Sequence, residues 1–289
     1  MMRGRTLYVV SAGFLALVLC SCAGIPMREY TSSSLEKQAY ASYVEHDIRG
    51  AIAYYEEALA IHLVNNKLER AAEVYSQLGA LYYLSEDMDR AISNYREALK
   101  IYTSRKDLKS MAWVSSSIGT VYLSIKKYEE ASRFFTQAQQ LAEKGNNLEL
   151  VASALNGLGL VSKRLSNLDE AQQYYEQALN INGRINNKCG MAENYNNLGA
   201  LSEQQGNLEE ALNYYQQALK LDVESNRPEA LAVSHSNLGY VYEAMGMYEQ
   251  SLHHYRIARQ INKWLKNKER AEQDLQDIQR LERRRIALP

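Results

Sequence analysis

The amino-acid sequence predicts an all-α fold: a right-handed α-solenoid of about six helix-turn-helix units, closed by a C-terminal capping helix. Two patterns with a period of forty residues predict this fold class. An apolar residue followed by glycine recurs, at Gly79, Gly119, Gly159, Gly199 and Gly239. An alanine with an aromatic residue three positions earlier also recurs, at Ala58, Ala98, Ala138, Ala178, Ala218 and Ala258. A fixed period of this length indicates stacked units that share a core only with their neighbours.

The amino terminus predicts a targeting segment ahead of the repeats. Arg3 and Arg5 stand before a run that is almost wholly apolar, residues 7–19. This run is shorter than the ~20 residues that a membrane-spanning helix needs. We therefore expect an export signal and not a permanent membrane span.

The end of this apolar run resembles the lipobox of bacterial lipoproteins. Its residues are Leu19-Cys20-Ser21-Cys22, and the resemblance implies cleavage before Cys22 and acylation of that cysteine with lipid such as palmitate. We expect a signal peptide over residues 1–21, a lipid attachment at Cys22 and a flexible tether over residues 22–34. The alternative is an ordinary signal peptide that has two cysteines near its cleavage site.

The repeated units follow over residues 35–271. In one unit Ala72, Tyr75, Leu78 and Tyr82 follow the three-and-four spacing of a helix face. A polar break then precedes a second helix that begins at Met88, and polar residues that tolerate turns close the unit. The predicted units lie near residues 32–71, 72–111, 112–151, 152–191, 192–231 and 232–271.

The repeated glycines predict close contact between helices. Glycine in a helix interior costs about 1 kcal/mol relative to alanine, so five glycines at one repeat position need a physical reason. We expect each glycine to face an alanine of the neighbouring helix, so that the two backbones approach closely. Their role is then structural.

The two ends of the array depart from the repeat, as terminal units do. Gln38-Ala39 stand where the other units have the apolar residue and glycine. At the carboxyl end Ala271, Leu275, Ile278 and Leu281 form an apolar stripe in a charged segment. This stripe predicts a capping helix and tail over residues 272–289.

The repeat resembles the tetratricopeptide repeat (TPR). One unit shows its pattern of aromatic, Leu-Gly, Ala, aromatic and Ala, at Tyr195, Leu198-Gly199, Ala211, Tyr215 and Ala218. The usual repeat has about 34 residues, so this chain is similar to the long-repeat branch found in kinesin light chains. We expect the six extra residues to lengthen the second helix and its loop. The resemblance implies the fold, but TPR arrays serve many unrelated functions.

Composition and motifs favour a binding protein over an enzyme. The net charge of −1 gives no electrostatic case for a nucleic-acid partner. The sequence has no phosphate-binding loop or hydrolase nucleophile motif, and its five histidines lack metal-ligand spacing. We expect no catalytic residue, no cofactor and no metal. The sequence assigns no role to Cys189.

The resemblance also implies where a partner binds. In TPR arrays the first helices line a concave groove, and the residue before Leu-Gly often contacts the backbone of an extended ligand. An amide suits this task because it both donates and accepts hydrogen bonds, and an exposed aromatic ring supplies an apolar anchor. The candidate groove residues are Asn197, Asn237 and Gln77 before Leu-Gly, Asn156, Asn196 and Ser116 one residue earlier, and Tyr240 as the anchor. The alternative is that the asparagines only cap or solvate the first helices.

Together these features predict a non-enzymatic, lipid-anchored scaffold or adaptor of the bacterial cell envelope. We expect it to bind a protein or an extended peptide in its groove, as part of an envelope assembly or secretion complex. Ala23 stands where an aspartate retains lipoproteins on the inner membrane of enteric bacteria. We therefore expect the outer membrane, on its periplasmic face. The alternative is a cytoplasmic or periplasmic TPR regulator that senses peptides and carries no lipid anchor.

Overall fold

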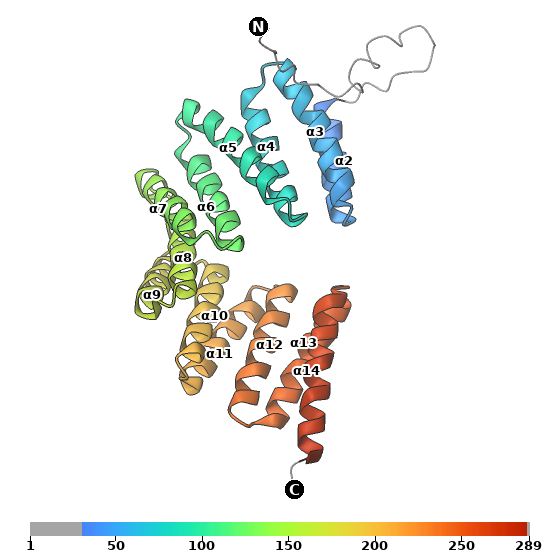
Figure 1. The fold of residues 1–289 in the computed structure, drawn as a ribbon, viewed down its shortest axis with the longest axis vertical. Coiled ribbons are helices and arrows are strands. Elements are labelled where there is room, and N and C mark those ends of the chain that lie inside the picture. Colours follow the sequence, from blue (N-terminus) through green and yellow to red (C-terminus); the bar gives the residue numbers. More distant parts are fainter. Residues whose placement is uncertain (1–30, 288–289) are drawn as a thin grey trace, which may run out of the picture.

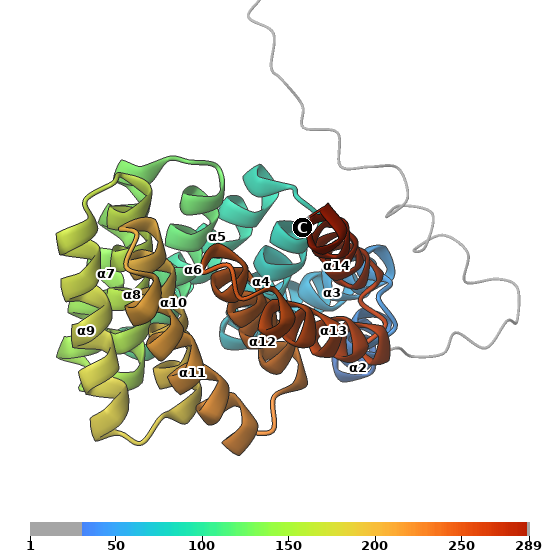
Figure 2. The same cartoon turned by 90° about the horizontal axis from the view of Figure 1, so that it is seen from below.

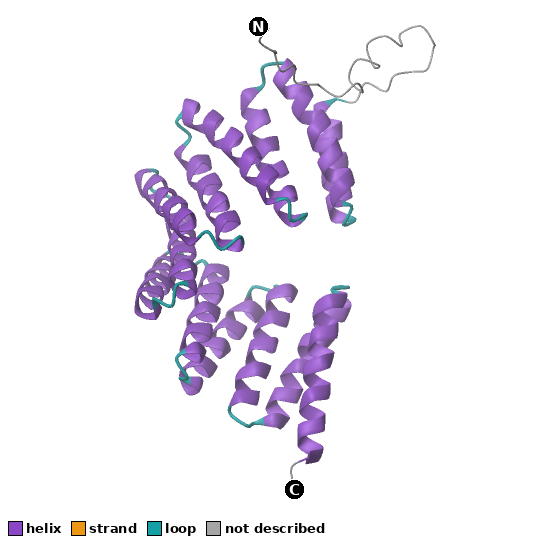
Figure 3. Cartoon of the chain, viewed as in Figure 1, coloured by secondary structure: helices purple, strands orange, loops and turns teal. Residues whose placement is uncertain are grey.

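The described part of the chain is an unbroken series of α-helices. The computed structural model describes residues 31–287, and Figure 3 shows helices joined by short loops throughout this range. The predicted signal peptide, Cys22 and most of the tether lie outside the described residues. The helices are α2 (Ser32–Val44), α3 (Ile48–Val64), α4 (Leu68–Leu84), α5 (Met88–Arg105), α6 (Leu108–Ser124), α7 (Tyr128–Lys144), α8 (Leu148–Arg164), α9 (Leu168–Arg184), α10 (Lys188–Gln204), α11 (Leu208–Glu224), α12 (Pro228–Ala244), α13 (Tyr248–Trp264) and α14 (Lys268–Ala287).

Successive helices pack against each other in chain order, which confirms the predicted solenoid of helical pairs. The pairs stack into a curved body (Figure 1). Its first pair, α2 and α3, and its last helices, α13 and α14, lie at opposite ends but on the same side of the body, as both Figure 1 and Figure 2 show. The solenoid is therefore a curved stack with an inner and an outer side.

The forty-residue period has a different origin from the one that the resemblance implied. The extra residues do not lengthen only the second helix, because first and second helices of the central pairs both contain 17 residues. Turns of three residues join them, so two helices and two turns give forty residues. The first helices begin about four residues before the unit boundaries expected from the sequence, and α14 begins at Lys268.

The turns explain these early helix starts. The middle residue of each three-residue turn has a left-handed backbone, whether it is a glycine such as Gly206 or another residue such as Asn146. The next residue caps the helix that follows. In α6, α8 and α10 this cap is Asp107, Asn147 or Asn187, whose side chain accepts a hydrogen bond from the backbone N–H three residues later. Such caps stabilise a helix by about 1 kcal/mol.

The repeated glycines lie against aromatic rings and not against alanines, which corrects the expected packing. A Cβ atom on Gly159 would lie 2.5 Å from the Tyr175 ring, and one on Gly199 would lie 2.7 Å from the Tyr215 ring. Each ring comes from the second helix of the same pair. The glycine therefore gives space for the face of an aromatic ring. The repeated alanine lies three residues after that ring, on the same helix as the ring.

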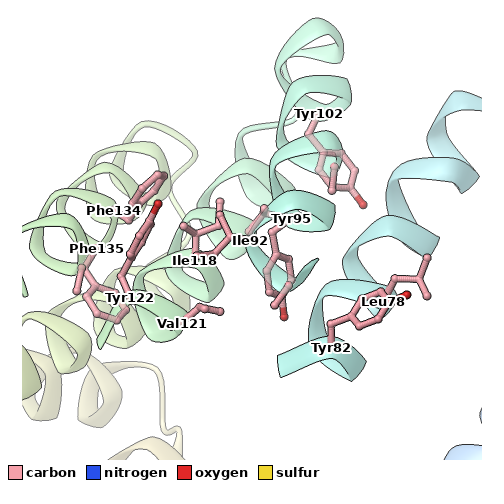
Figure 4. Close-up of a cluster of buried hydrophobic side chains, with 14 of the residues drawn as sticks. Leu78, Tyr82, Ile92, Tyr95, Tyr102, Ile118, Val121, Tyr122, Phe134 and Phe135 are labelled. Carbon is pink, nitrogen blue, oxygen red and sulfur yellow. The ribbon is translucent and has the colours of Figure 1, made fainter. Parts of the chain in front are cut away.

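The hydrophobic core is larger in the amino-terminal half. One cluster of buried side chains extends from α4 to α8, and Figure 4 shows part of it, including Tyr95, Ile118 and Phe135. The clusters that follow are smaller and separate. Between them lie buried polar pairs, which join Asn182 to Asn194, Asp222 to Ser234 and Asn262 to Asp274. The two halves of one repeat array are thus held together by different chemistry.

Candidate partner-binding groove

The first helices of the pairs form the inner layer of the solenoid. α4 contacts α6, α6 contacts α8, and α8 contacts α10, across the intervening second helices. Elements that contact across an intervening helix lie on the shorter, inner side of a curved stack. All the candidate groove residues lie on these inner helices: Gln77 on α4, Ser116 on α6, Asn156 on α8, Asn196 and Asn197 on α10, and Asn237 and Tyr240 on α12.

Four of the predicted asparagines form hydrogen-bonded pairs across the repeats. Nδ2 of Asn197 donates to Oδ1 of Asn156 over 2.7 Å. One repeat later Nδ2 of Asn237 donates to Oδ1 of Asn196 over 3.0 Å. We call these four residues the amide ladder. Each amide keeps further donor and acceptor capacity after this bond, so the ladder can both fix the helices and contact a ligand.

The remaining predicted residues lie outside the amide ladder. Gln77 is exposed on α4, Ser116 is half-buried on α6, and Tyr240 is exposed on α12. Tyr240 therefore presents an aromatic surface on the helix that also carries Asn237. The structure brings together the asparagines of the carboxyl-terminal half and leaves Gln77 and Ser116 apart from them.

The inner helices change character along the array. In the amino-terminal half they expose large apolar side chains: Tyr40, Tyr43, Val44, Leu84 and Trp113. A cavity of about 340 Å³ opens next to this region, between α4, α6 and α8, and its lining includes Tyr83, Leu123 and Arg164. In the carboxyl-terminal half one of these repeat positions carries charge, because Glu203 and Glu243 are the counterparts of Tyr43. A bound segment would meet apolar surface first and polar surface later.

The charged residues of the inner helices are partly buried or paired within the protein. Burial lowers the pKa of Lys163 and raises the pKa of Glu203, whose carboxylate accepts a hydrogen bond from the Tyr215 hydroxyl over 3.1 Å. Glu243 accepts from Arg280 over 2.6 Å and from Arg284 over 3.1 Å, both on α14. Helix α14 therefore covers the end of the stack and also holds a carboxylate of the inner layer.

Sequence reasoning missed a second set of amides beside the ladder. Nδ2 of Asn187 donates to Asn182, Asn182 donates to Asn194, and Asn194 donates to Asn156, over 3.1, 2.7 and 3.3 Å. These residues line a pocket of about 250 Å³ between α8 and α10. One signal could have revealed them. Ala142 and Ala154 occupy the same repeat positions as Asn182 and Asn194, one unit earlier. The replacement of two alanines by two asparagines therefore indicates a polar pair at this junction.

Two histidines that the sequence separates come together near the end of the groove. Nδ1 of His235 on α12 lies 2.9 Å from Nδ1 of His254 on α13. Burial, with smaller contributions from His235 and His253, lowers the pKa of His254 to about 4. Burial also lowers the pKa of His235. Over residues 31–287 no group of three or more His, Cys, Asp or Glu side chains is arranged to hold a metal ion.

Comparison with known proteins supports this architecture. The sequence profile of the MalT-like TPR region matches residues 38–288. Among curated proteins, none matches the sequence.

Several solved structures share the fold. BtubC (BKLC) from P. vanneervenii is 24% identical, with a TM-score of 0.61 over 81% of this chain and 92% of that one. Aspartyl phosphate phosphatase F from Bacillus subtilis is 15% identical, with a TM-score of 0.67 over 87% of this chain and 70% of that one. A Rap protein complexed with Competence and Sporulation Factor is 16% identical, with a TM-score of 0.63 over 88% of this chain and 75% of that one. At these identities the likeness shows the fold alone.

Proposed function

The chain belongs to the family with a MalT-like TPR region, and from this premise we propose that it is a non-enzymatic scaffold that holds a protein or an extended peptide in its inner groove. TPR arrays present a large concave surface to their partners. The amide ladder is the observation that carries the proposal. Its asparagines lie half-buried on the inner helices, where they can meet the backbone of an extended chain.

The change of character along the inner helices supports a segment with two kinds of residue. Exposed aromatic and aliphatic side chains of α2, α4 and α6 offer an apolar contact, and aromatic anchors tend to dominate interface energy. The amide ladder and the charged residues of α8 to α12 offer polar contacts. The partner is therefore an extended segment that has apolar residues at one end and polar residues at the other.

The proposed location is the bacterial cell envelope, with a lipid anchor at Cys22. The support is the sequence Leu19-Cys20-Ser21-Cys22 after a short apolar run. None of the helices described over residues 31–287 is long and apolar enough to span a bilayer. We place the protein on the periplasmic face of the outer membrane, in a complex for envelope assembly or secretion.

A second candidate function is a peptide-sensing regulator without an anchor. The observation that favours it is the shared fold with the Rap protein complexed with Competence and Sporulation Factor. Metabolic labelling with palmitate separates the two candidates. The scaffold proposal expects label on the wild-type chain and none on Cys22→Ser, whereas an unlabelled wild-type chain would favour the regulator.

Partner capture tests the groove. The full chain with Asn197→Ala and Asn237→Ala should recover several-fold less crosslinked partner from intact cells, because two amides of the ladder are lost. The matched control is Asn180→Ala with Asn213→Ala, two exposed asparagines on second helices. Thermal melting of both proteins shows whether the fold is kept. Equal partner recovery from the two folded variants would exclude this groove as the binding site.

A further inference from the structure

The α8–α10 pocket has an occupied copy elsewhere in the same protein. In the next interface, between α10 and α12, the pocket position is taken by the protein's own Arg227. One guanidinium nitrogen, Nη2, lies 3.8 Å from Oδ1 of Asp222, and Nη1 lies 3.6 Å from Oε1 of Glu193. The guanidinium also interacts with the side chain of Cys189. The repeat thus shows which group fits this position.

The open pocket lies at the same place one repeat earlier, but its wall residues differ in chemistry. The residues that contact Arg227 are Cys189, Glu193 and Asp222, and their counterparts forty residues earlier are Glu149, Ser153 and Asn182. All three counterparts line the α8–α10 pocket. The counterpart of Arg227 is Asn187, whose short side chain turns to cap α10 and to donate to Asn182. The volume is therefore open because an asparagine replaces an arginine.

The chemistry of the open pocket also suits a guanidinium group. Its lining contains two carboxylates, Glu149 and Glu193, together with amides and the Ser153 hydroxyl, and no lysine or arginine. Glu193 lies between the two interfaces and is shared with Arg227, whereas Glu149 has no such partner in the pocket lining. A guanidinium group presents five N–H donors in one plane and pairs well with carboxylates. The volume of about 250 Å³ is below the range of about 300–1,000 Å³ typical of drug-sized ligands. It therefore suits one side chain and not a whole peptide.

The pocket adjoins the proposed groove. Asn156 lines the pocket and also accepts a hydrogen bond from Asn197 in the amide ladder. A segment that lies on the ladder can place one side chain in the pocket. We propose that the α8–α10 pocket is a specificity pocket for an arginine side chain of the peptide partner. This inference rests on the proposed function, because it assumes an extended partner in the groove.

Two peptides test the pocket on the full chain. The probe is acetyl-Gly-Gly-Arg-Gly-Gly-amide, and its control replaces arginine with citrulline, which has a similar shape and no charge. Asparagine side chains labelled with ¹⁵N report binding by NMR. The arginine peptide should shift the signals of Asn156, Asn182 and Asn194, and should bind about tenfold more tightly than the citrulline peptide, because charge-assisted hydrogen bonds are the stronger kind. Equal affinity of the two peptides would overturn the proposal.

Substitutions give two further readouts. Glu149→Gln with Glu193→Gln should weaken the arginine peptide about tenfold and leave the citrulline peptide unchanged. The control pair Glu57→Gln with Glu129→Gln, both exposed on second helices, should change neither. Arg227→Asn should open the copy of the pocket between α10 and α12, so that the arginine peptide now also shifts Asn196, the counterpart of Asn156. An Asn196 signal that does not move in the folded Arg227→Asn protein would contradict the pocket's assignment.

The outcomes separate this inference from the groove itself. Suppose that partner capture is lost with Asn197→Ala and Asn237→Ala but is unchanged with Glu149→Gln and Glu193→Gln. The arginine pocket would then be wrong and the groove would stand. Capture that is lost with both pairs of substitutions, and kept with both control pairs, supports the two proposals together.

Discussion

At the scale of single residues, the repeated glycines show how one missing atom sets the packing of a helical pair. Gly159 lies against the face of the Tyr175 ring, closer than a Cβ atom would allow. Gly183, on the second helix of the same pair, has no neighbour within 4 Å of where its Cβ would lie. Two glycines of one pair therefore have opposite packing environments.

This contrast predicts opposite effects of alanine. Gly159→Ala should lower the free energy of unfolding by about 1–3 kcal/mol, because overpacking displaces the Tyr175 ring. Gly183→Ala should raise it by up to about 1 kcal/mol, because alanine is the better helix former and meets no clash. Urea unfolding followed by circular dichroism measures both. The same sign for the two variants would show that ring contact does not explain the repeated glycine.

The histidine pair predicts a pH dependence. Because the pKa of His254 falls from its ordinary 6.5 to about 4 in the folded protein, the unfolded chain takes up a proton at higher pH than the folded one. The stabilising contribution is therefore present above about pH 6.5 and is lost as the pH falls towards 4. We expect a loss on the order of 1 kcal/mol, reduced by the partial exposure of the ring.

The check is the melting temperature between pH 7 and pH 4. His254→Gln should reduce the decrease in melting temperature over this range relative to the wild-type protein. His46→Gln is the control, because His46 lies exposed in a turn and should leave the slope unchanged. If the melting temperature of the His254→Gln protein falls with pH as steeply as that of the wild-type protein, the histidine pair is not the cause of the pH dependence.

At the scale of helices, the junctions between pairs change from apolar to polar chemistry along the array. The junction that contains Ala142 and Ala154 is apolar, whereas the next one pairs Asn182 with Asn194 at the same repeat positions. A buried hydrogen bond contributes little net stability, but a buried polar group without a partner costs about 1–3 kcal/mol. Loss of one of the two amides should therefore destabilise the second junction more than loss of both.

A double-mutant cycle tests this junction. Asn182→Ala alone should lower the free energy of unfolding by about 1–3 kcal/mol, because it leaves the Asn194 amide without its buried donor. The double variant Asn182→Ala and Asn194→Ala copies the Ala142 and Ala154 junction, so it should recover part of this loss. Urea unfolding gives the coupling energy. Simple additivity of the two single effects would contradict the interpretation.

At the scale of the whole molecule, the array combines one repeat geometry with two kinds of core. The amino-terminal half shares a large apolar cluster from α4 to α8. The carboxyl-terminal half has smaller clusters and buried polar pairs. In a solenoid each unit is stabilised only by itself and its neighbours, so stability can differ along the chain.

This asymmetry predicts that the carboxyl-terminal half opens first. α4 and α12 are a fair comparison, because each is the third described helix from its end of the array. In native-state hydrogen exchange the backbone amides of α4 should show the larger opening free energy, since more apolar area is buried around them. Equal protection of α4 and α12 would show that the array opens as one cooperative unit.

The sequence by itself determined the solenoid, because small and aromatic residues at a forty-residue period require stacked helical pairs with a shared core. It also selected the asparagines of the amide ladder, since their spacing from Leu-Gly places them on the inner helices. Only the tertiary structure decided the rest: the ring beneath each glycine, the bond from Asn197 to Asn156, the contact of His235 with His254, and Arg227 filling the copy of an open pocket. The physical reason is that periodicity reports which face of a helix is buried, whereas the partner across that face depends on the offset and curvature of the stack.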